Sequence, residues 1–294
     1  MRHSSERRNS MCRRFFDEVT VISDDPSQVE RLWQRYWSYS PELSDVVPLK
    51  PTAFEIQTIE LLLTAAGQFV DSLGLVQSKH LSAERILVLD GDEFREKIDP
   101  AAGGMIRGGW AYLIRGSNKE FAHDASHEIA HLASFQRIRV TRREDNGREL
   151  VHIAPERSGM SSRVRMNVAE NTSGADVPIF VGLNEAITEL VARHLRFELI
   201  REAPNLLTAD EADWLLETVT YGSQIRLAEH VLGLARDDDA GIIPASLLDY
   251  FTGTSTLLRR LRERCPGSVR VLTGMGTEPE DAFAAARLLG LDMG

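Results

Sequence analysis

Three histidines follow one another at four-residue intervals in the stretch FAHDASHEIAH, which spans residues 121–131. They are His123, His127 and His131, and Glu128 directly follows the middle one. In an α-helix, side chains four positions apart lie on one face, about one turn apart. Two such imidazoles can meet at one metal ion, because zinc–nitrogen bonds are about 2.0–2.1 Å long. His127 and His131 are therefore candidate metal ligands, and Glu128 beside them is placed as a base.

His123, the remaining histidine, does not fit the same ion. A straight helix rises 1.5 Å per residue, so the three histidines span about 12 Å, and zinc cannot reach both outer members. We expect His123 to be a partly exposed helix residue, and direct ligation by His123 is the alternative. Asp124 lies one turn before the His127–Glu128 pair, and it is a candidate for a supporting contact to the site or a solvated helix charge.

A hydrolytic zinc site takes three protein ligands and leaves one position open. The stretch LNEAITE offers a carboxylate for the third place at Glu185, more than fifty residues after His131. The helix dipole alone would favour one acidic residue near the start of a helix. It does not explain Glu189, which follows Glu185 one turn later on the same face. The pair of glutamates therefore favours a metal site.

The two stretches together resemble a known family. HEIAH at 127–131 and NEAITE at 184–189 look like the motif pair of the gluzincin metallopeptidases, thermolysin among them. The interval between the motifs is longer than in thermolysin and nearer that of the anthrax-lethal-factor-like zincins. The resemblance covers about residues 105–200. The chain has no GxMEN-type exopeptidase signature and no tyrosine and histidine at the thermolysin offsets, so the resemblance does not extend to one particular branch.

The resemblance implies a role for each matching residue. His127, His131 and Glu185 would bind one zinc ion, and Glu128 would act as the base that activates a zinc-bound water. Glu189 would orient His127, because zinc histidines generally donate their second ring nitrogen to a carboxylate or a similar acceptor.

A peptide substrate would also need a surface to bind. In zincins generally an extended peptide lies along an edge strand, and the strand expected at 108–115 would take that place here. The contacting residues would then be Trp110, Ala111 and Tyr112.

Hydrolysis of an amide further needs a donor that meets the negative charge developing on the carbonyl oxygen. The candidates are Tyr221, Tyr112 and His152. We favour Tyr221 because its helix is expected to pack beside the helix of Glu185. The alternative for Tyr221 is a half-buried tyrosine that only contributes packing.

Other elements must bring these motifs together. Periodicity and capping signals predict helices at 26–39, 51–74, 117–135 and 182–201, and then at about 208–235, 244–264 and 278–289. Strands are expected at 85–94 and 103–116, a hairpin around Asn146-Gly147 at 137–153, and an irregular segment at 155–180. Ser117 and Glu120 form a capping box, and Asn184 is the expected N-cap of its helix.

The fold expected from this order is α+β and zincin-like. A small mixed N-terminal sheet carries the active-site helix, and a mostly helical C-terminal lobe follows. We expect one catalytic domain at 25–294, with a mixed lobe at 25–135, a hairpin insertion at 136–156 and a helical lobe at 181–294. Residues 1–24 are expected to form a basic, disordered tail.

Composition excludes several classes of function. The 294 residues carry a formal charge of −10, opposite to that of a general nucleic-acid binder. No apolar run reaches the roughly 20 residues of a membrane-spanning helix. The two cysteines are too few for a thiolate metal site, so nitrogen and oxygen must bind the zinc. No apolar segment follows the basic start, which favours a cytoplasmic protein, with non-classical export as the alternative.

The sequence therefore predicts a metallopeptidase with one zinc ion that cleaves a peptide or protein substrate. Two alternatives stay open. One is a zincin-shaped regulatory or binding protein without proteolytic activity, and the other is a zinc hydrolase acting on a non-peptide amide. The substrate, the choice between endo- and exopeptidase action and the oligomeric state do not follow from the sequence.

Overall fold

The computed structural model describes residues 18–22, 47–75, 81–97, 103–107, 109–145, 148–166, 175–234 and 242–291. The strands are β1 (Glu18–Ile22), β2 (Ile86–Leu89), β3 (Gly104–Arg107), β4 (Trp110–Ile114), β5 (Gln136–Asp145), β6 (Arg148–Ser158), β7 (Ser161–Met166) and β8 (Ala175–Ile179). The longer helices are α2 (Ala53–Ser72), α4 (Asn118–Ala133), α5 (Val181–Glu202), α7 (Gly222–Leu234) and α8 (Ile242–Thr252). The shorter ones are α3 (Gly91–Lys97), α6 (Ala209–Glu217), α9 (Thr256–Arg264), α10 (Ser268–Thr273) and α11 (Pro279–Leu288). The fold is α+β, as the sequence predicts.

The small sheet has the strand order β2-β4-β3, with β4 in the middle. β2 runs parallel to β4, and β3 runs antiparallel to it. Successive side chains of β4 point to opposite faces. Ala111 and Leu113 join the main core together with Phe121 and Ile129 of α4, whereas Tyr112 packs with a second cluster. The sheet therefore rests one face on α4.

The start of α4 is fixed by local signals. Ser117 and Glu120 form the predicted capping box. Just before it, Arg115 forms an ion pair of 2.8 Å with the buried Glu55, which belongs to a second capping box with Thr52 at the start of α2. This ion pair connects the first turn of α2 with the residues just before α4.

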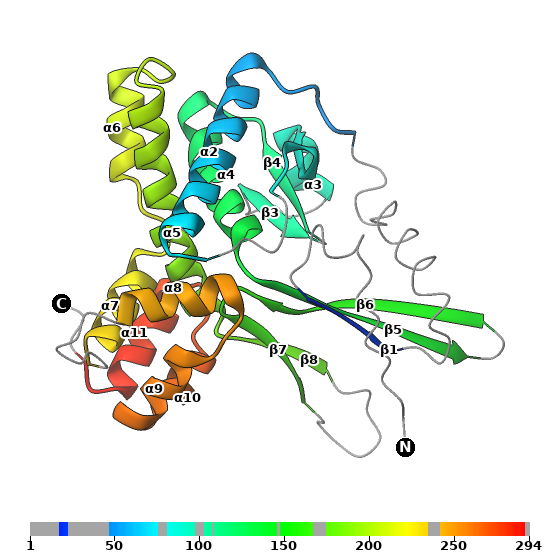
Figure 1. Cartoon of the computed structure of the whole chain (residues 1–294), viewed down its shortest axis with the longest axis vertical. Helices are drawn as coiled ribbons and strands as arrows, with labels where there is room; N and C mark the ends of the chain where they lie inside the picture. The colour runs from blue at the N-terminus through cyan, green and yellow to red at the C-terminus, as the bar shows by residue number, and fades with distance from the viewer. Residues whose placement is uncertain are drawn as a thin grey trace.

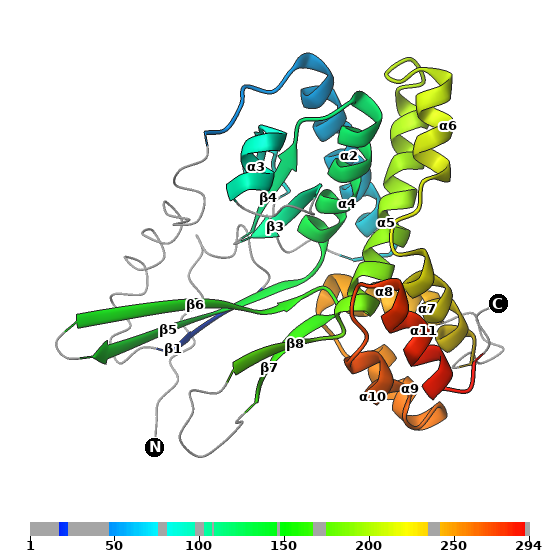
Figure 2. The ribbon, with the colours of Figure 1, turned by 180° about the vertical axis from the view of Figure 1, so that it is seen from behind.

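α5 is the central helix of the fold. It packs against α4, α2 and α7 and runs between the upper helices and the C-terminal ones (Figures 1 and 2). Its N-cap is Phe180 in a left-handed conformation (φ 59°), so the expectation of an Asn184 cap is wrong. Asn184 lies one turn inside the helix, where its Oδ1 accepts hydrogen bonds from the backbone N–H of Met160 and Ser161. This side chain anchors α5 to the β6–β7 turn.

A five-stranded sheet, β1-β5-β6-β7-β8, extends away from the helices (Figure 1). The arms of the predicted hairpin are confirmed, with Asp145 opposite Arg148; Asn146 and Gly147 lie outside the described residues. The expectation of an irregular segment at 155–180 is wrong, because β7 and β8 form there. Residues 18–22, assigned by the sequence to a tail at 1–24, pair in parallel with β5 as β1.

Several element boundaries also differ from expectation. The segment 103–116 forms two antiparallel strands, with a turn that includes Gly109 at φ 77°. The strand expected at 85–94 ends at Leu89, and α3 follows. The helix expected at 208–235 is split into α6 and α7, since three β-branched residues in succession, 218–220, are poor helix formers. The helix expected at 244–264 is split at Gly253 (φ 71°).

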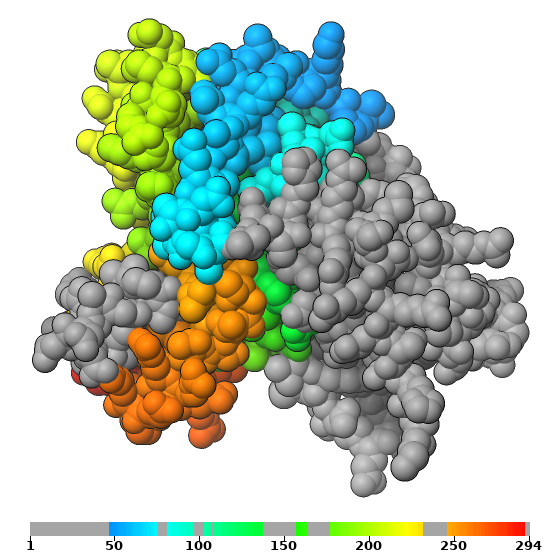
Figure 3. Space-filling view, in the orientation of Figure 1, coloured from blue at the N-terminus to red at the C-terminus, as the bar shows by residue number. Residues whose placement is uncertain are grey.

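The described helices form one continuous body. In the space-filling view, α2 lies between the α5–α6 pair and the cyan segment 81–97, and the C-terminal helices lie below it (Figure 3). Within the described residues, no helix combines the length and the apolar character needed to cross a membrane. The helix predicted at 26–39 lies outside the described residues.

Candidate metal centre

The centre begins with two turns of α4. His127 and His131 lie on its face toward α5, with ring centroids 4.8 Å apart. Ala130 and Ile129 between them are fully buried in the core, which fixes the rotation of the helix. The two imidazoles are therefore held on the inner side of the helix, as the four-residue spacing predicts.

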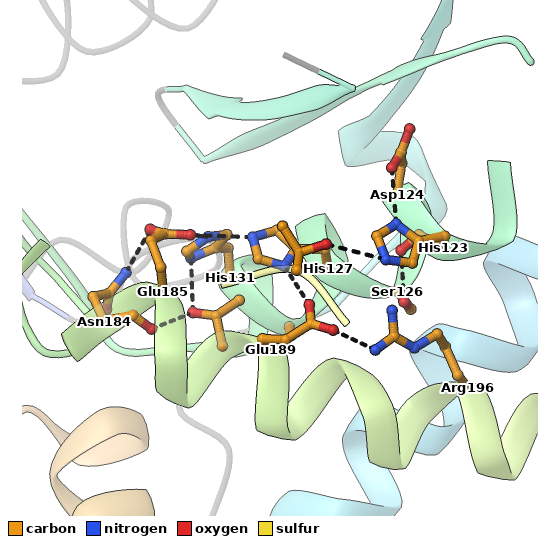
Figure 4. A network of polar contacts seen from close by, with 12 residues as sticks. His123, Asp124, Ser126, His127, His131, Asn184, Glu185, Glu189 and Arg196 are labelled. Carbon is orange, nitrogen blue, oxygen red and sulfur yellow. Dashed lines mark hydrogen bonds and ion pairs between the residues drawn. The ribbon is translucent and has the colours of Figure 1, made fainter. Parts of the chain in front are cut away.

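α5 supplies the carboxylate opposite them. Oε2 of Glu185 lies 3.1 Å from Nε2 of His127 and 3.1 Å from Nε2 of His131 (Figure 4). One ligand atom from each of the three residues lies within 4.8 Å of the others, so the group could hold a metal ion. Two imidazole nitrogens and one carboxylate oxygen form a donor set suited to a zinc-type ion.

The second ring nitrogen of His127 meets another carboxylate. Oε2 of Glu189 lies 3.2 Å from Nδ1 of His127, and its other oxygen is ion-paired with Arg196. Glu189 and Arg196 are both fully buried. A carboxylate is an acceptor only, so Nδ1 donates to Glu189. Nε2 faces Glu185 and is the nitrogen that a metal would take once its proton is displaced.

His131 is held by a hydroxyl instead. Oγ1 of Thr188 lies 3.2 Å from Nδ1 of His131, 2.8 Å from the backbone oxygen of Asn184 and 2.8 Å from the hydroxyl of Tyr250. Tyr250 of α8 in turn donates to the backbone oxygen of Ala130. The Thr188 hydroxyl has one proton, which it donates to Asn184 or to Tyr250. It can therefore only accept from Nδ1 of His131, so Nδ1 carries the proton of that ring. Nε2 of His131 is then also available.

The charges of the group depend on one another. Burial opposes a charge on His127, but hydrogen bonds to Glu185 and Glu189 outweigh it and raise the pKa of His127 to about 10. Burial also opposes the charge on Glu185, and here the two histidines prevail and hold its pKa far below the usual range. A proton and a metal ion therefore compete for Nε2 of His127.

Glu128 lies on the flank of the two histidines and is 7% exposed. Burial raises the pKa of Glu128, and the nearby histidines oppose that rise. A Cβ atom added at Gly104 of β3 would lie 2.9 Å from Cγ of Glu128 and 3.0 Å from the backbone oxygen of Tyr112. The strand thus passes directly over the Glu128 side chain, and a glycine permits this approach.

Tyr221 lies on the other side of His127. Its ring centroid is 5.6 Å from that of His127, with the planes tilted by 35°. Burial and the neighbouring carboxylates raise the pKa of the Tyr221 hydroxyl, so it remains a proton donor. The sequence predicts that Tyr221 lies in a helix, and this is wrong. Tyr221 lies in the turn between α6 and α7, with φ 58°.

His123 and Asp124 stand apart from the metal group. Nε2 of His123 lies 3.2 Å from Oγ1 of Thr220, and its Nδ1 lies 3.1 Å from Oδ1 of Asp124. His123 is not among the three residues whose ligand atoms converge. The side chain of Asp124 thus contacts His123 rather than His127 or His131.

The expected edge strand is wrong. Trp110, Ala111 and Tyr112 belong to β4, which has neighbours on both sides, so its backbone cannot receive a further strand. β3 is the edge strand beside Glu128. The hydroxyl donor considered at Tyr112 is also excluded, since this residue packs among Leu89, Phe94 and Ile114 on the sheet face away from α4. The side chain of His152 lies outside the described residues.

Four contributing residues were not recognised in the sequence. They are Thr188, Arg196, Thr220 and Tyr250. Thr188 lies inside the NEAITE motif, next to Glu189, and could have been suspected for that reason. The other three belong to segments without a motif. Comparison with protein-family models, with curated proteins and with solved structures gives no match to this chain.

Proposed function

We propose that this protein is a zinc-dependent metallopeptidase of zincin-like fold. The observation that carries the proposal is the convergence of His127, His131 and Glu185 within 4.8 Å, with the buried Glu128 on their flank. Glu189 and Thr188 hold the Nδ1 atoms of the two histidines, so that both Nε2 atoms face Glu185. This arrangement fits zinc, whose catalytic sites take three protein ligands and an open position.

A zinc ion bound here would act as a Lewis acid toward the substrate carbonyl, and it would lower the pKa of a water molecule bound to it. Glu128 takes the proton from the attacking water, because it is a buried carboxylate on the flank of the two histidines, and its burial raises its pKa. Glu128 then hands the proton to the leaving amine. Tyr221 donates a hydrogen bond to the carbonyl oxygen, on which negative charge develops.

The free edge of β3 is the place for an extended substrate. The strand passes over Glu128, and among the described residues no strand pairs with its outer side. A peptide can pair with such an edge through main-chain hydrogen bonds. We infer that the substrate is a peptide or an unfolded protein segment rather than a compact small amide.

The test combines metal content with cleavage. The parent should contain one zinc per chain by mass spectrometry and should cleave peptides of a mixed library. Glu128→Gln should retain the zinc and lose at least about 100-fold in turnover, since it lacks the base. Glu60→Gln, on an exposed position of α2, is the matched control.

A second variant tests the ligand set. Glu185→Ala should lose zinc, whereas Glu202→Ala at the exposed end of the same helix should not. Equal zinc in both variants, or full cleavage by Glu128→Gln, would overturn the proposal. Zinc binding without cleavage of any peptide would favour a binding protein or a hydrolase of a non-peptide amide.

A further inference from the structure

His123, the first of the three histidines in FAHDASHEIAH, has a contact that the metal centre does not require. It lies on α4 one turn before His127, and its imidazole is almost buried, with 11% of the side chain exposed. Nδ1 faces the carboxylate of Asp124 at 3.1 Å, so Nδ1 carries the proton. In the neutral ring, Nε2 is then an acceptor, and the hydroxyl of Thr220 at 3.2 Å is its donor.

Thr220 directly precedes Tyr221 in the α6–α7 turn. α4 therefore makes two successive contacts with this turn, one from His123 to Thr220 and one from His127 to the ring of Tyr221. The ring of His123 also packs edge-on against Trp214 of α6, with centroids 5.9 Å apart. His123 therefore lies between Trp214 of α6 and Thr220 of the turn.

The turn needs such support. Tyr221 has φ 58°, a left-handed conformation that costs free energy in a residue other than glycine. From this position its backbone oxygen accepts the first hydrogen bond of α7, from the N–H of Ile225 at 2.9 Å. A turn released at Thr220 could relax Tyr221 to an ordinary conformation and move its ring away from His127.

We propose that His123 is a positioning residue: through Thr220 it holds the Tyr221 turn so that the tyrosine stays against His127. The positioning stands on the contacts of the turn alone, and its kinetic consequence rests on the function proposed above. His123 itself touches neither the substrate nor the metal. His123, the first histidine of FAHDASHEIAH, thereby receives a role distinct from ligation.

The first measurement does not depend on activity. Amide hydrogen exchange of the segment 218–222 is compared in the protein as purified and in Thr220→Val, which removes the hydroxyl but keeps the shape. Exchange should rise about three- to tenfold, the range expected from losing one neutral hydrogen bond. Thr220→Ser and His123→Gln, which keep a donor and an acceptor, should stay near the parent, and His123→Phe should behave as Thr220→Val.

The second measurement is kinetic. Thr220→Val should lower kcat about three- to tenfold with KM and zinc content unchanged. In a Tyr221→Phe background it should have no further effect, because His123 acts through Tyr221. Thr218→Val is the matched control, since the Thr218 hydroxyl bonds within α6, to the backbone oxygen of Trp214.

Unchanged exchange in Thr220→Val would overturn the proposal, and so would a full additional loss of kcat in the Tyr221→Phe background. If the parent cleaves nothing, the proposed function fails, and the exchange comparison still decides whether His123 holds the turn.

Discussion

Oε2 of Glu189 lies 3.2 Å from Nδ1 of His127, in the buried interface between α4 and α5. The same carboxylate is paired with Arg196 seven residues later on α5. A buried carboxylate in this position fixes the ring orientation and raises the basicity of the nitrogen that faces a metal. Glu189 is therefore expected to determine metal affinity without touching the metal.

Glu189→Gln should weaken zinc binding about 10- to 100-fold, measured by competition with a chelating dye. The variant also leaves the buried Arg196 without its charge partner, so thermal unfolding must be recorded in parallel. Glu198→Gln is the matched control, because Glu198 is a largely buried glutamate of the same helix that pairs with the exposed Arg201 instead of with a histidine. Equal affinity in Glu189→Gln and the parent would contradict the assigned role.

Thr188→Val should weaken zinc binding by about tenfold. Valine keeps the shape of threonine but removes the acceptor for Nδ1–H of His131, which fixes its tautomer. Thr188→Ser should restore affinity, and Tyr250→Phe should have a smaller effect because it acts through Thr188. A Thr188→Val variant that binds zinc as tightly as the parent would show that the hydroxyl network has no part in ligand orientation.

The residues of the candidate site differ in how far the sequence alone could predict them. His127, Glu128 and His131 follow from helix geometry, since their relation is local. Glu185 and Glu189 are candidates because a zinc site needs a third ligand and the two share one helix face. Their individual roles needed the family resemblance, because nothing local connects them with a motif more than fifty residues away. Tyr250 lies a further sixty-two residues beyond Thr188, and only the packing of α8 against α4 and α5 brings it there.

The wrong predictions of strands and helices have a similar origin. Strand order is a tertiary property. The sequence predicts an edge strand at 108–115, whereas β4, which forms there, lies in the centre of the small sheet. β7 and β8 were hidden by a Ser-, Gly- and Asn-rich composition. The α6–α7 break, in contrast, has a local signal in the β-branched run before Tyr221, and this signal went unrecognised.

Zinc binding should become tighter as pH rises. With both ring nitrogens bonded to carboxylates, the pKa of His127 is raised to about 10, and zinc must displace the proton on Nε2. Calorimetry in buffers of different ionisation enthalpy should therefore detect the release of about one proton per zinc at pH 7. Release of no proton would mean that His127 is already neutral at that pH.

The same pKa predicts how the metal-free protein responds to pH. Because the folded pKa of His127 is raised, its contribution to the free energy of unfolding is complete below about pH 6.5 and is lost as pH rises through about 10. Chelator-treated protein should lose stability over this range, and zinc-loaded protein should not. Urea unfolding at a series of pH values measures both.

Gly104→Ala should lower turnover about 10- to 100-fold while zinc content stays unchanged. The added Cβ would lie 2.9 Å from Cγ of Glu128, so the proposed base must move, and a misplaced base would slow the proposed reaction. The backbone oxygen of Tyr112 at 3.0 Å blocks the alternative of moving the strand toward β4. Gly274→Ala, whose Cβ would find its nearest neighbour at 3.9 Å, controls for the loss of a glycine. If Gly104→Ala cleaves as fast as the parent, then Glu128 is not held against β3 during the reaction.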